Sequence, residues 1–519
     1  MRTALFFSVL AVLLSACTQA PPPPSAPAGP RRLALAFTGN GLGTIDPCGC
    51  VDRQRGGLAR RATVLSKLRQ DYPELLYVDY GNTLFATNEL TDLEKDQKTQ
   101  KAKLIVQALG EMKLAAYSVG GNDLAGGWEV LRSILADAKF PVLSANLYDA
   151  KTGSPLFQPW AVVETGGIRL GITATSDAGD GVQIPEGIQI RPAAESVAAI
   201  LPELRAKSDK VVVLYRGAVQ ERIKIARMDG VDILAGFPDH AGGHARAEGN
   251  AILAATSGRG ESVGFLSFLL DGGKKGYVRE DEERAARIEA ELAGEKAAEA
   301  RKNGNEKAAA VQEAKARDYR VRLEEMSSKI PFEIRFIDVS EETPQDSGVH
   351  LLVDHFRRQQ EQAATLLYGE SRDLYTREEG RFAGAESCRT CHLPQYDNWL
   401  NTRHAHAFDT LAKTHQTSDQ ECLSCHTTGY LNDGGFQGAY APLLFRNVQC
   451  ESCHGPAATH VRTPREVKPP RKVNPVTCIK CHGVKHEETF KFAEALPIVA
   501  CPVAKIFGDG EGAGNPPKK

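Results

Sequence analysis

Four short motifs of cysteine and histidine lie in the last third of this 519-residue chain. Each has the form Cys-x-x-Cys-His, and they begin at Cys388, Cys422, Cys450 and Cys478. Two thiols at this spacing fit within one tight turn and can add to the two vinyl groups of a haem. The histidine that follows then lies under the iron as its proximal ligand.

The sequence therefore predicts four covalently attached haem c groups. Zinc is the alternative, because paired Cys-x-x-Cys units also form zinc ribbons. The trailing histidine in all four motifs favours haem, and disulfide pairing would leave those histidines unexplained. The predicted haem-binding cysteines are Cys388, Cys391, Cys422, Cys425, Cys450, Cys453, Cys478 and Cys481, and the proximal iron ligands are His392, His426, His454 and His482.

The second axial ligand of each iron is predicted from composition. Residues 350–519 contain no methionine, so methionine ligation, which raises haem potentials, is not expected. Histidine is abundant instead, since 11 of the 13 histidines lie at or after position 350. We expect bis-histidine haems of low potential, with the distal ligands drawn from His404 or His406, His460 and His486.

Four cysteines lie outside the haem motifs: Cys17, Cys48, Cys50 and Cys501. Cys17 ends the run Leu-Ser-Ala-Cys after Arg2 and a short apolar stretch, which resembles a bacterial lipoprotein signal peptide. That resemblance implies export and lipidation of Cys17, with an anchor at the periplasmic face of the outer membrane or at the cell surface. An ordinary signal peptide is the alternative. Cys48 and Cys50 allow a disulfide, a thiol pair or a weak metal ligand set.

The haem motifs are part of a longer pattern. Its elements are Ser387 to His392, Trp399, Arg403-His-Ala-His-Ala-Phe408, Gly435-Phe436, Gln449-Cys-Glu-Ser-Cys-His-Gly-Pro456 and His460. This pattern resembles the tetrahaem cytochrome family that accepts electrons from hydroxylamine oxidoreductase. The resemblance implies closely packed haems and electron exchange with redox partner proteins. It also leaves open redox catalysis on a small nitrogen or sulfur compound at one haem with an open site.

Upstream of the haem motifs, strand-like and helix-like runs alternate, which is typical of an α/β domain. The expected strands are residues 32–37, 74–80, 114–120, 168–174, 210–215, 231–236 and 251–256, and the clearest helices are residues 58–70 and 99–113.

This α/β region resembles the metallophosphoesterase domain of the 5′-nucleotidase family. The resemblance rests on Gly56-Gly-Leu-Ala-Arg-Arg61, on Ser144-Ala-Asn-Leu147 and on the order of further segments. In that family carboxylates, histidines and an asparagine hold two metal ions that activate water. The positions that correspond to those ligands read Asn40, Leu42, Asn82, Asn122, Asp123, Arg216, Phe237 and Asp239.

Of these positions only Asn122 keeps the family's residue. Leucine and phenylalanine cannot ligate a metal, and Arg216 puts a positive charge where a cation should bind. We therefore expect a domain that keeps the fold and has lost hydrolysis. The alternative is hydrolysis of phosphoesters at a one-metal site of Asp46, Asp79, Asp123 and His240. The arginines Arg60, Arg61 and Arg216 are either candidates for anion binding or ordinary surface charges.

The expected fold class is an α/β metallophosphoesterase-like sandwich, then a helical hairpin and a mostly α, loop-rich tetrahaem domain. Net charge is −2, which argues against a nucleic-acid binder. Electron transfer is favoured over hydrolysis. The predicted parts are a signal peptide (1–17), a Pro-rich tether (18–31), the phosphoesterase-like domain (32–276), a charged hairpin (277–330), a linker with a helix (331–384), the tetrahaem domain (385–490) and a flexible tail (491–519).

Overall fold

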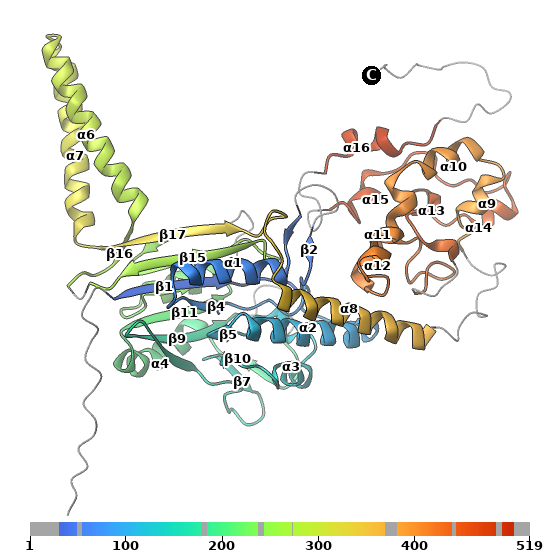
Figure 1. The fold of residues 1–519 in the computed structure, drawn as a ribbon, viewed down its shortest axis with the longest axis horizontal. Coiled ribbons are helices and arrows are strands. Elements are labelled where there is room, and N and C mark those ends of the chain that lie inside the picture. Colours follow the sequence, from blue (N-terminus) through green and yellow to red (C-terminus); the bar gives the residue numbers. More distant parts are fainter. Residues whose placement is uncertain are drawn as a thin grey trace, which may run out of the picture.

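The computed structural model describes residues 31–48, 54–177, 184–236, 243–271, 273–368, 381–438, 443–483 and 490–502. They form two parts that lie next to each other along the long axis of the molecule (Figure 1). We call residues 31–368 the α/β unit and residues 381–502 the C-terminal region. The predictions for the signal peptide, Cys17, Cys50, His240 and His486 lie outside the described residues.

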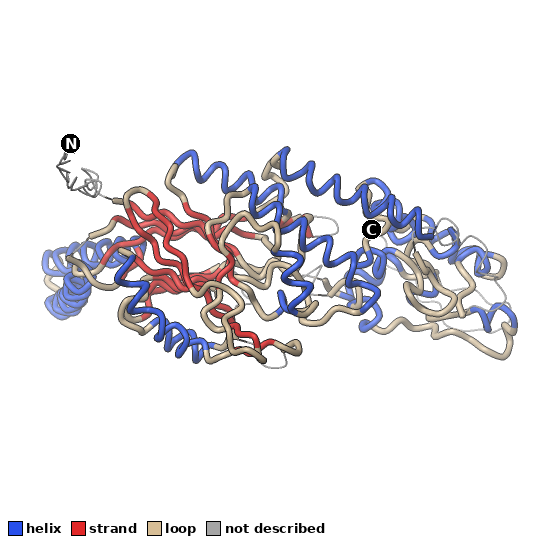
Figure 2. Tube along the Cα trace, turned by 90° about the horizontal axis from the view of Figure 1, so that it is seen from below, coloured by secondary structure: helices blue, strands red, loops and turns tan. Residues whose placement is uncertain are grey.

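Two β-sheets form the centre of the α/β unit, and Figure 2 shows the strands gathered there. The first sheet has the order β16-β17-β15-β1-β4-β5-β6, and the second has the order β13-β14-β12-β11-β9-β8. The first sheet comprises β1 (Arg32–Thr38), β4 (Leu76–Asp79), β5 (Ala116–Ser118), β6 (Val142–Leu143), β15 (Ser262–Leu269), β16 (Tyr277–Arg279) and β17 (Ile330–Asp338). The second comprises β8 (Trp160–Thr165), β9 (Ile168–Ser176), β11 (Lys210–Arg216), β12 (Ile233–Ala235), β13 (His244–Glu248) and β14 (Ala251–Ala255). Two short pairs complete the strands: β2 (Pro47–Cys48) with β3 (Arg55–Gly56), and β7 (Leu147–Asp149) with β10 (Ile188–Ile190).

The α/β unit has four layers, because helices cover the outer face of each sheet. In β1, Leu33, Leu35 and Phe37 belong to the apolar core between the sheets, while Ala34 and Ala36 belong to the core under the helices. Burial on both faces explains why this strand is a continuous apolar run. The helices over the first sheet are α1 (Leu58–Asp71), α2 (Asp92–Glu111), α3 (Trp128–Leu135) and α8 (Ser347–Tyr368), and those over the second are α4 (Ala193–Lys207) and α5 (Val219–Ala226).

The predicted hairpin consists of α6 (Glu280–Lys302) and α7 (Glu306–Ser327), which project from one end of the sandwich (Figure 1). The chain then returns as β17, which pairs antiparallel with β15 and parallel with β16. Residues 330–338 are thus part of the first sheet and not of a linker, and α8 packs through Val349 and Val353 into the core of the α/β unit. The sandwich therefore continues beyond residue 276, and the hairpin is an insertion within it.

The C-terminal region is helical and rich in loops. Its small core contains Phe382, Phe408, Leu411, Leu423, Phe436 and Phe445. Its helices are α9 (Ala385–Arg389), α10 (Leu393–Leu400), α11 (Ala407–Lys413), α12 (Gln420–His426), α13 (Cys450–His454), α14 (Ala458–Arg462), α15 (Pro475–Ile479) and α16 (Phe492–Val499), with single 3₁₀ turns at Arg403–His406 and Leu443–Phe445. None of the helices described in the chain combines the length and apolar character needed to cross a membrane.

Candidate functional sites

Each of the four Cys-x-x-Cys-His motifs lies on one helical turn. In the first motif the amide of His392 donates to the carbonyl of Cys388 at 2.9 Å, and in the fourth His482 donates to Cys478 at 2.8 Å. Residues three apart share a face of such a turn, so the two thiols of a motif lie on the same side. Helices α9, α12, α13 and α15 thus give each motif the local geometry that attachment to two vinyl groups requires.

Two pairs of histidine rings face each other across the C-terminal region. The ring centroids of His392 and His460 are 6.2 Å apart, and those of His404 and His482 are 6.1 Å apart. Two metal–imidazole bonds of about 2 Å each, plus about 1 Å from each nitrogen to its ring centre, add up to about 6 Å. Both separations therefore fit one metal ion between the rings.

Three histidines are oriented by hydrogen bonds to backbone carbonyls. The Nδ1 atoms of His426, His454 and His460 lie 2.7 Å, 2.7 Å and 2.6 Å from the carbonyl oxygens of Ala407, Pro470 and Val467. Because a carbonyl only accepts, Nδ1 carries the proton in each ring. The electron pair of Nε2 is then the one left for a metal, which is the usual arrangement around ligating histidines.

The two neighbouring candidates His404 and His406 differ in their surroundings. Burial lowers the pKa of His404, which favours the neutral imidazole that metal binding requires. His406 is exposed, and its Nε2 lies 3.2 Å from the carbonyl oxygen of Leu400. Of these two, His404 is the one that faces a motif histidine. Among the described residues, no second histidine ring faces His426 or His454 in this way.

Thiols of different motifs lie close to one another. A hydrogen bond with Cys450, together with burial, raises the pKa of Cys388, and a hydrogen bond with Cys481 lowers that of Cys425. The first motif thus lies beside the third, and the second lies beside the fourth.

One buried carboxylate that sequence reasoning did not single out holds this arrangement together. Glu451, between the cysteines of the third motif, is 3% exposed and accepts hydrogen bonds from the amides of Ala383, Gly384 and Ala457 at 2.7–3.1 Å. Its neighbour Gln449 accepts from the amide of Ala385 at 2.7 Å. The third motif is therefore tied to the segment that leads into the first. The signal in the sequence was the acidic residue inside a haem motif.

In the α/β unit, the backbone around the family's metal-ligand positions is unusual. Asn40, Leu42 and Asn82 adopt left-handed conformations with φ of 55°, 52° and 53°. Such values are rare for residues other than glycine and cluster at functional sites. Backbone hydrogen bonds hold the two loops together, from Leu42 to the carbonyl of Asn82 and from Gly43 to that of Thr83. A loop geometry typical of a functional site is present although a leucine stands in it.

Both buried carboxylates near these loops are surrounded by donors of the protein itself. Asp79 accepts from the hydroxyls of Thr38 and Thr83 at 2.7 and 2.8 Å and from the amide of Gly81 at 3.0 Å.

Asp123 accepts from the hydroxyl of Tyr117 and from three backbone amides, those of Asn82, Leu84 and Gly120, all at 2.8–2.9 Å. A carboxylate with this many internal donors has little capacity left for a cation.

Three further predicted residues of this area differ in their surroundings. Asp46 pairs with Arg357 of α8. Arg60 and Arg61 are 8% and 1% exposed, so the interpretation as surface charges is wrong for both. Within the described ranges, no group of three or more histidine, cysteine, aspartate or glutamate side chains is arranged to hold a metal ion.

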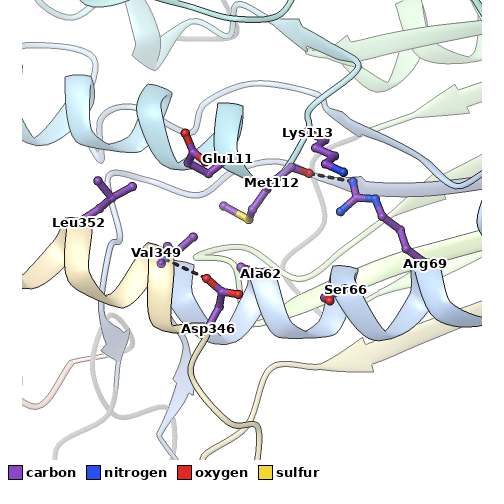
Figure 3. Close-up of a pocket in the computed structure, with 10 residues that line it drawn as sticks. Ala62, Ser66, Arg69, Glu111, Met112, Lys113, Asp346, Val349 and Leu352 are labelled. Atoms are coloured by element: carbon purple, nitrogen blue, oxygen red, sulfur yellow. Dashed lines mark hydrogen bonds between the residues drawn. The ribbon is translucent and has the colours of Figure 1, made fainter.

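A surface cleft of about 470 Å³ lies elsewhere, between α1, the end of α2 and the start of α8 (Figure 3). Two of its polar side chains already have partners: Arg69 donates to the carbonyl of Met112 at 2.8 Å, and Asp346 accepts from the amide of Val349 at 3.0 Å. The cleft includes none of the predicted site residues.

The two parts of the molecule thus define two classes, a c-type cytochrome region and a phosphoesterase-like α/β sandwich. Residues 387–455 match the family model described as cytochrome c554 and c-prime. Cytochrome c-554 of Nitrosomonas europaea is 33% identical over 91 residues, which cover 14% of this chain and 38% of that protein. This region is therefore of the cytochrome c554 type, which carries covalently bound haem c.

The α/β unit has relatives of its own. A 2′,3′-cyclic-nucleotide 2′-phosphodiesterase/3′-nucleotidase of Yersinia enterocolitica is 33% identical over 114 residues, 22% of this chain and 17% of that protein. Among solved structures, a 5′-nucleotidase precursor from Thermus thermophilus aligns with 72% of this chain and 68% of its own, at 18% identity and a TM-score of 0.46. The chain joins a 5′-nucleotidase-like region to a cytochrome c554-type region, and it spans less than two fifths of either curated relative.

Proposed function

We propose that this protein is a tetrahaem electron-transfer cytochrome, exported and held at the periplasmic face of the outer membrane or the cell surface by a lipid on Cys17. Bound haem would supply reversible one-electron chemistry. All four Cys-x-x-Cys-His motifs would attach it, with His392, His426, His454 and His482 as proximal ligands. Redox partner proteins would deliver and accept the electrons.

The observation that carries this proposal is the facing of histidine rings at 6.1 and 6.2 Å. In this proposal His460 is the distal ligand opposite His392, and His404 is the distal ligand opposite His482. Ligation by two imidazoles favours low potentials. The adjacency of first and third motifs, and of second and fourth, supports short distances between haems and hence rapid electron transfer.

The α/β unit serves in this proposal as a scaffold and not as a hydrolase. The donors around Asp79 and Asp123 support this role. The domain boundaries follow: the scaffold extends through β17 and α8, and the tetrahaem domain begins near residue 385.

A second candidate is redox catalysis on a small nitrogen or sulfur compound at an open haem. It is favoured by the second and third motifs, since no described histidine ring faces His426 or His454. High-spin ferric signals in the electron paramagnetic resonance (EPR) spectrum would support this candidate, and exclusively low-spin signals would exclude it.

The test of the main proposal is a haem count with spectra on the intact, membrane-purified protein. We expect four haems per chain by mass and by the absorbance of the alkaline pyridine complex, and at least two low-spin bis-histidine signals. A chain with fewer than four attached haems, or with no low-spin bis-histidine signal, would contradict the proposal. Lipid on Cys17 is checked by the mass of the N-terminal peptide.

A further inference from the structure

Seven consecutive residues directly before the second haem motif all contact the α/β unit. We call residues 415–421 the junction segment; it leads into Cys422 (Figure 1 shows α12 close to α2 and α8). The contacts are His415 and Thr417 with Glu361, Gln416 with Asp46, Ser418 and Gln420 with Gln97, and Asp419 and Glu421 with Lys101.

On one side, α8 and Asp46 hold the start of the junction segment. The carboxylate of Glu361 lies 2.9 Å from Nδ1 of His415 and accepts from the hydroxyl of Thr417 at 3.1 Å. Asp46 accepts from the side-chain amide of Gln416 at 3.0 Å. The backbone before the second motif is thereby fixed to the α/β unit.

On the other side, one face of α2 holds the end of the segment. Gln97 donates to the carbonyl of Ser418 at 2.7 Å and accepts from the amide of Gln420 at 3.0 Å, as a neighbouring strand would. Gln97 and Lys101 are four residues apart and therefore lie on the same face of the helix. This face is the one that α2 turns towards the C-terminal region.

Lys101 is the charged residue at the centre of this contact. It is 9% exposed, and its ammonium lies 2.7 Å from Glu421 and 3.9 Å from Asp419. Burial alone would lower the pKa of Lys101, but these two carboxylates raise it well above its usual value, so the cation persists. Its charge also acts on the thiol of Cys422, the residue after Glu421.

We propose that α2 of the α/β unit is part of the second haem site, and that the buried ammonium of Lys101 raises the reduction potential of the haem at Cys422–His426. This inference rests on the proposed function, because it requires haem at that motif. A nearby positive charge stabilises the reduced haem, which carries one positive charge less than the oxidised one. Because Lys101 is only 9% exposed, solvent screens its charge less, and the effect is larger than for an exposed lysine.

Opposite charge changes at this contact test the inference in the intact holoprotein. Spectroelectrochemical titration of Lys101→Met is expected to move one of the redox transitions to lower potential, and that of Glu421→Gln to move the same transition to higher potential. Lys101→Arg, which keeps the charge, is expected to restore the wild-type value. In this proposal the charge of Lys101, and not its volume, affects the reduction potential of the haem.

Two control variants separate charge from packing. Lys103→Met removes a lysine on an exposed face of the same helix, and Gln97→Met removes two junction hydrogen bonds without a change of charge. Neither variant is expected to lower the potential of the redox transition that Lys101→Met lowers. Unmoved potentials in both charge variants, or a shift of the same sign in both, would overturn the inference while four attached haems still supported the proposed function. Absence of haem from the second motif of the wild-type protein would contradict both the proposed function and this inference. The mass of the peptide around Cys422 shows whether haem is attached there and so distinguishes this outcome from the previous one.

Discussion

In the α/β unit, Asp79 and Asp123 are enclosed by hydroxyl and amide donors of the protein itself, whereas in the C-terminal region His426, His454 and His460 bond to carbonyls through Nδ1 and keep Nε2 for a metal. In the first arrangement the oxygens of the carboxylates are already occupied by hydrogen bonds. In the second, the hydrogen bond at Nδ1 leaves Nε2 of each histidine available to bind a metal. Residue types alone do not distinguish these two cases. What distinguishes them is the set of partners that each polar atom already has.

The two regions also differ in whether the backbone or the side chains carry the features of a functional site. The α/β unit keeps the left-handed backbone at Asn40, Leu42 and Asn82, which is rare for such residues, although leucine cannot serve as a ligand. A backbone typical of a functional site is thus present at positions that include a side chain unable to bind a metal. In the C-terminal region the helices are short, and the residues that could bind haem are held by individual hydrogen bonds such as those to Glu451.

The largest expected effect is on the C-terminal region, from Glu451→Leu. This change leaves three buried amides without an acceptor, at about 1–3 kcal/mol each, which is comparable to the whole stability of a small region. We expect loss of haem attachment, measured as haem per chain after purification. Glu466→Leu, at an exposed position, is the matched control. Full haem content in Glu451→Leu would show that the carboxylate does not hold the region together.

The next effect concerns a single haem and compares two neighbouring histidines. In His404→Ala the ring that faces His482 is lost, so one low-spin EPR signal should be replaced by a high-spin one. His406→Ala should leave the spectrum unchanged, because His406 bonds to a backbone carbonyl at the surface. The opposite result, with His406 as the sensitive residue, would mean that the observed pairing is not the axis of a haem.

A smaller effect is expected in the α/β unit, where burial raises the pKa of Asp123 to about 6. The folded state then binds a proton more readily than the unfolded chain, whose aspartates titrate near pH 4. The stability from this group is therefore fully present below about pH 4 and is lost as the pH rises through 6. The pKa of Asp123 differs by about two units between the folded and unfolded states, which corresponds to about 3 kcal/mol in the free energy of unfolding.

Calorimetric unfolding of the α/β unit within the whole protein checks this. Between pH 4 and 6 the wild type should lose stability with rising pH more steeply than Asp123→Asn, which cannot ionise at that position. Equal slopes would indicate that Asp123 titrates normally. Asp92→Asn, at an exposed position in the first turn of α2, is the control and should keep the wild-type slope.

Much of this fold was predictable from the sequence, because the expected strands and helices depend on local patterns of apolar residues, such as the continuous apolar run from Leu33 to Phe37. Local sequence does not predict the place of β17 in the first sheet, since residues 330–338 follow a hairpin of 48 residues and pair with a strand that precedes it. The spacing of cysteines and histidines predicted the haem-binding motifs. It did not predict which of His404 and His406 faces His482, or that Lys101 contacts Glu421, because those depend on packing between distant segments.

The smallest expected effect is no effect: added Mn²⁺ or Ca²⁺ should leave hydrolysis of nucleotides and phosphodiesters by the holoprotein at background. For Asp123 to bind a metal, it would have to give up four hydrogen bonds whose buried donors each cost about 1–3 kcal/mol when unpaired. Arg216, half-buried at the end of β11, adds a repelling charge. Turnover that disappears on chelation, and that is absent in Asp123→Asn, would reverse the comparison: the α/β unit would then be an active hydrolase joined to a haem region, and its enclosed carboxylates would have to open when the metal binds.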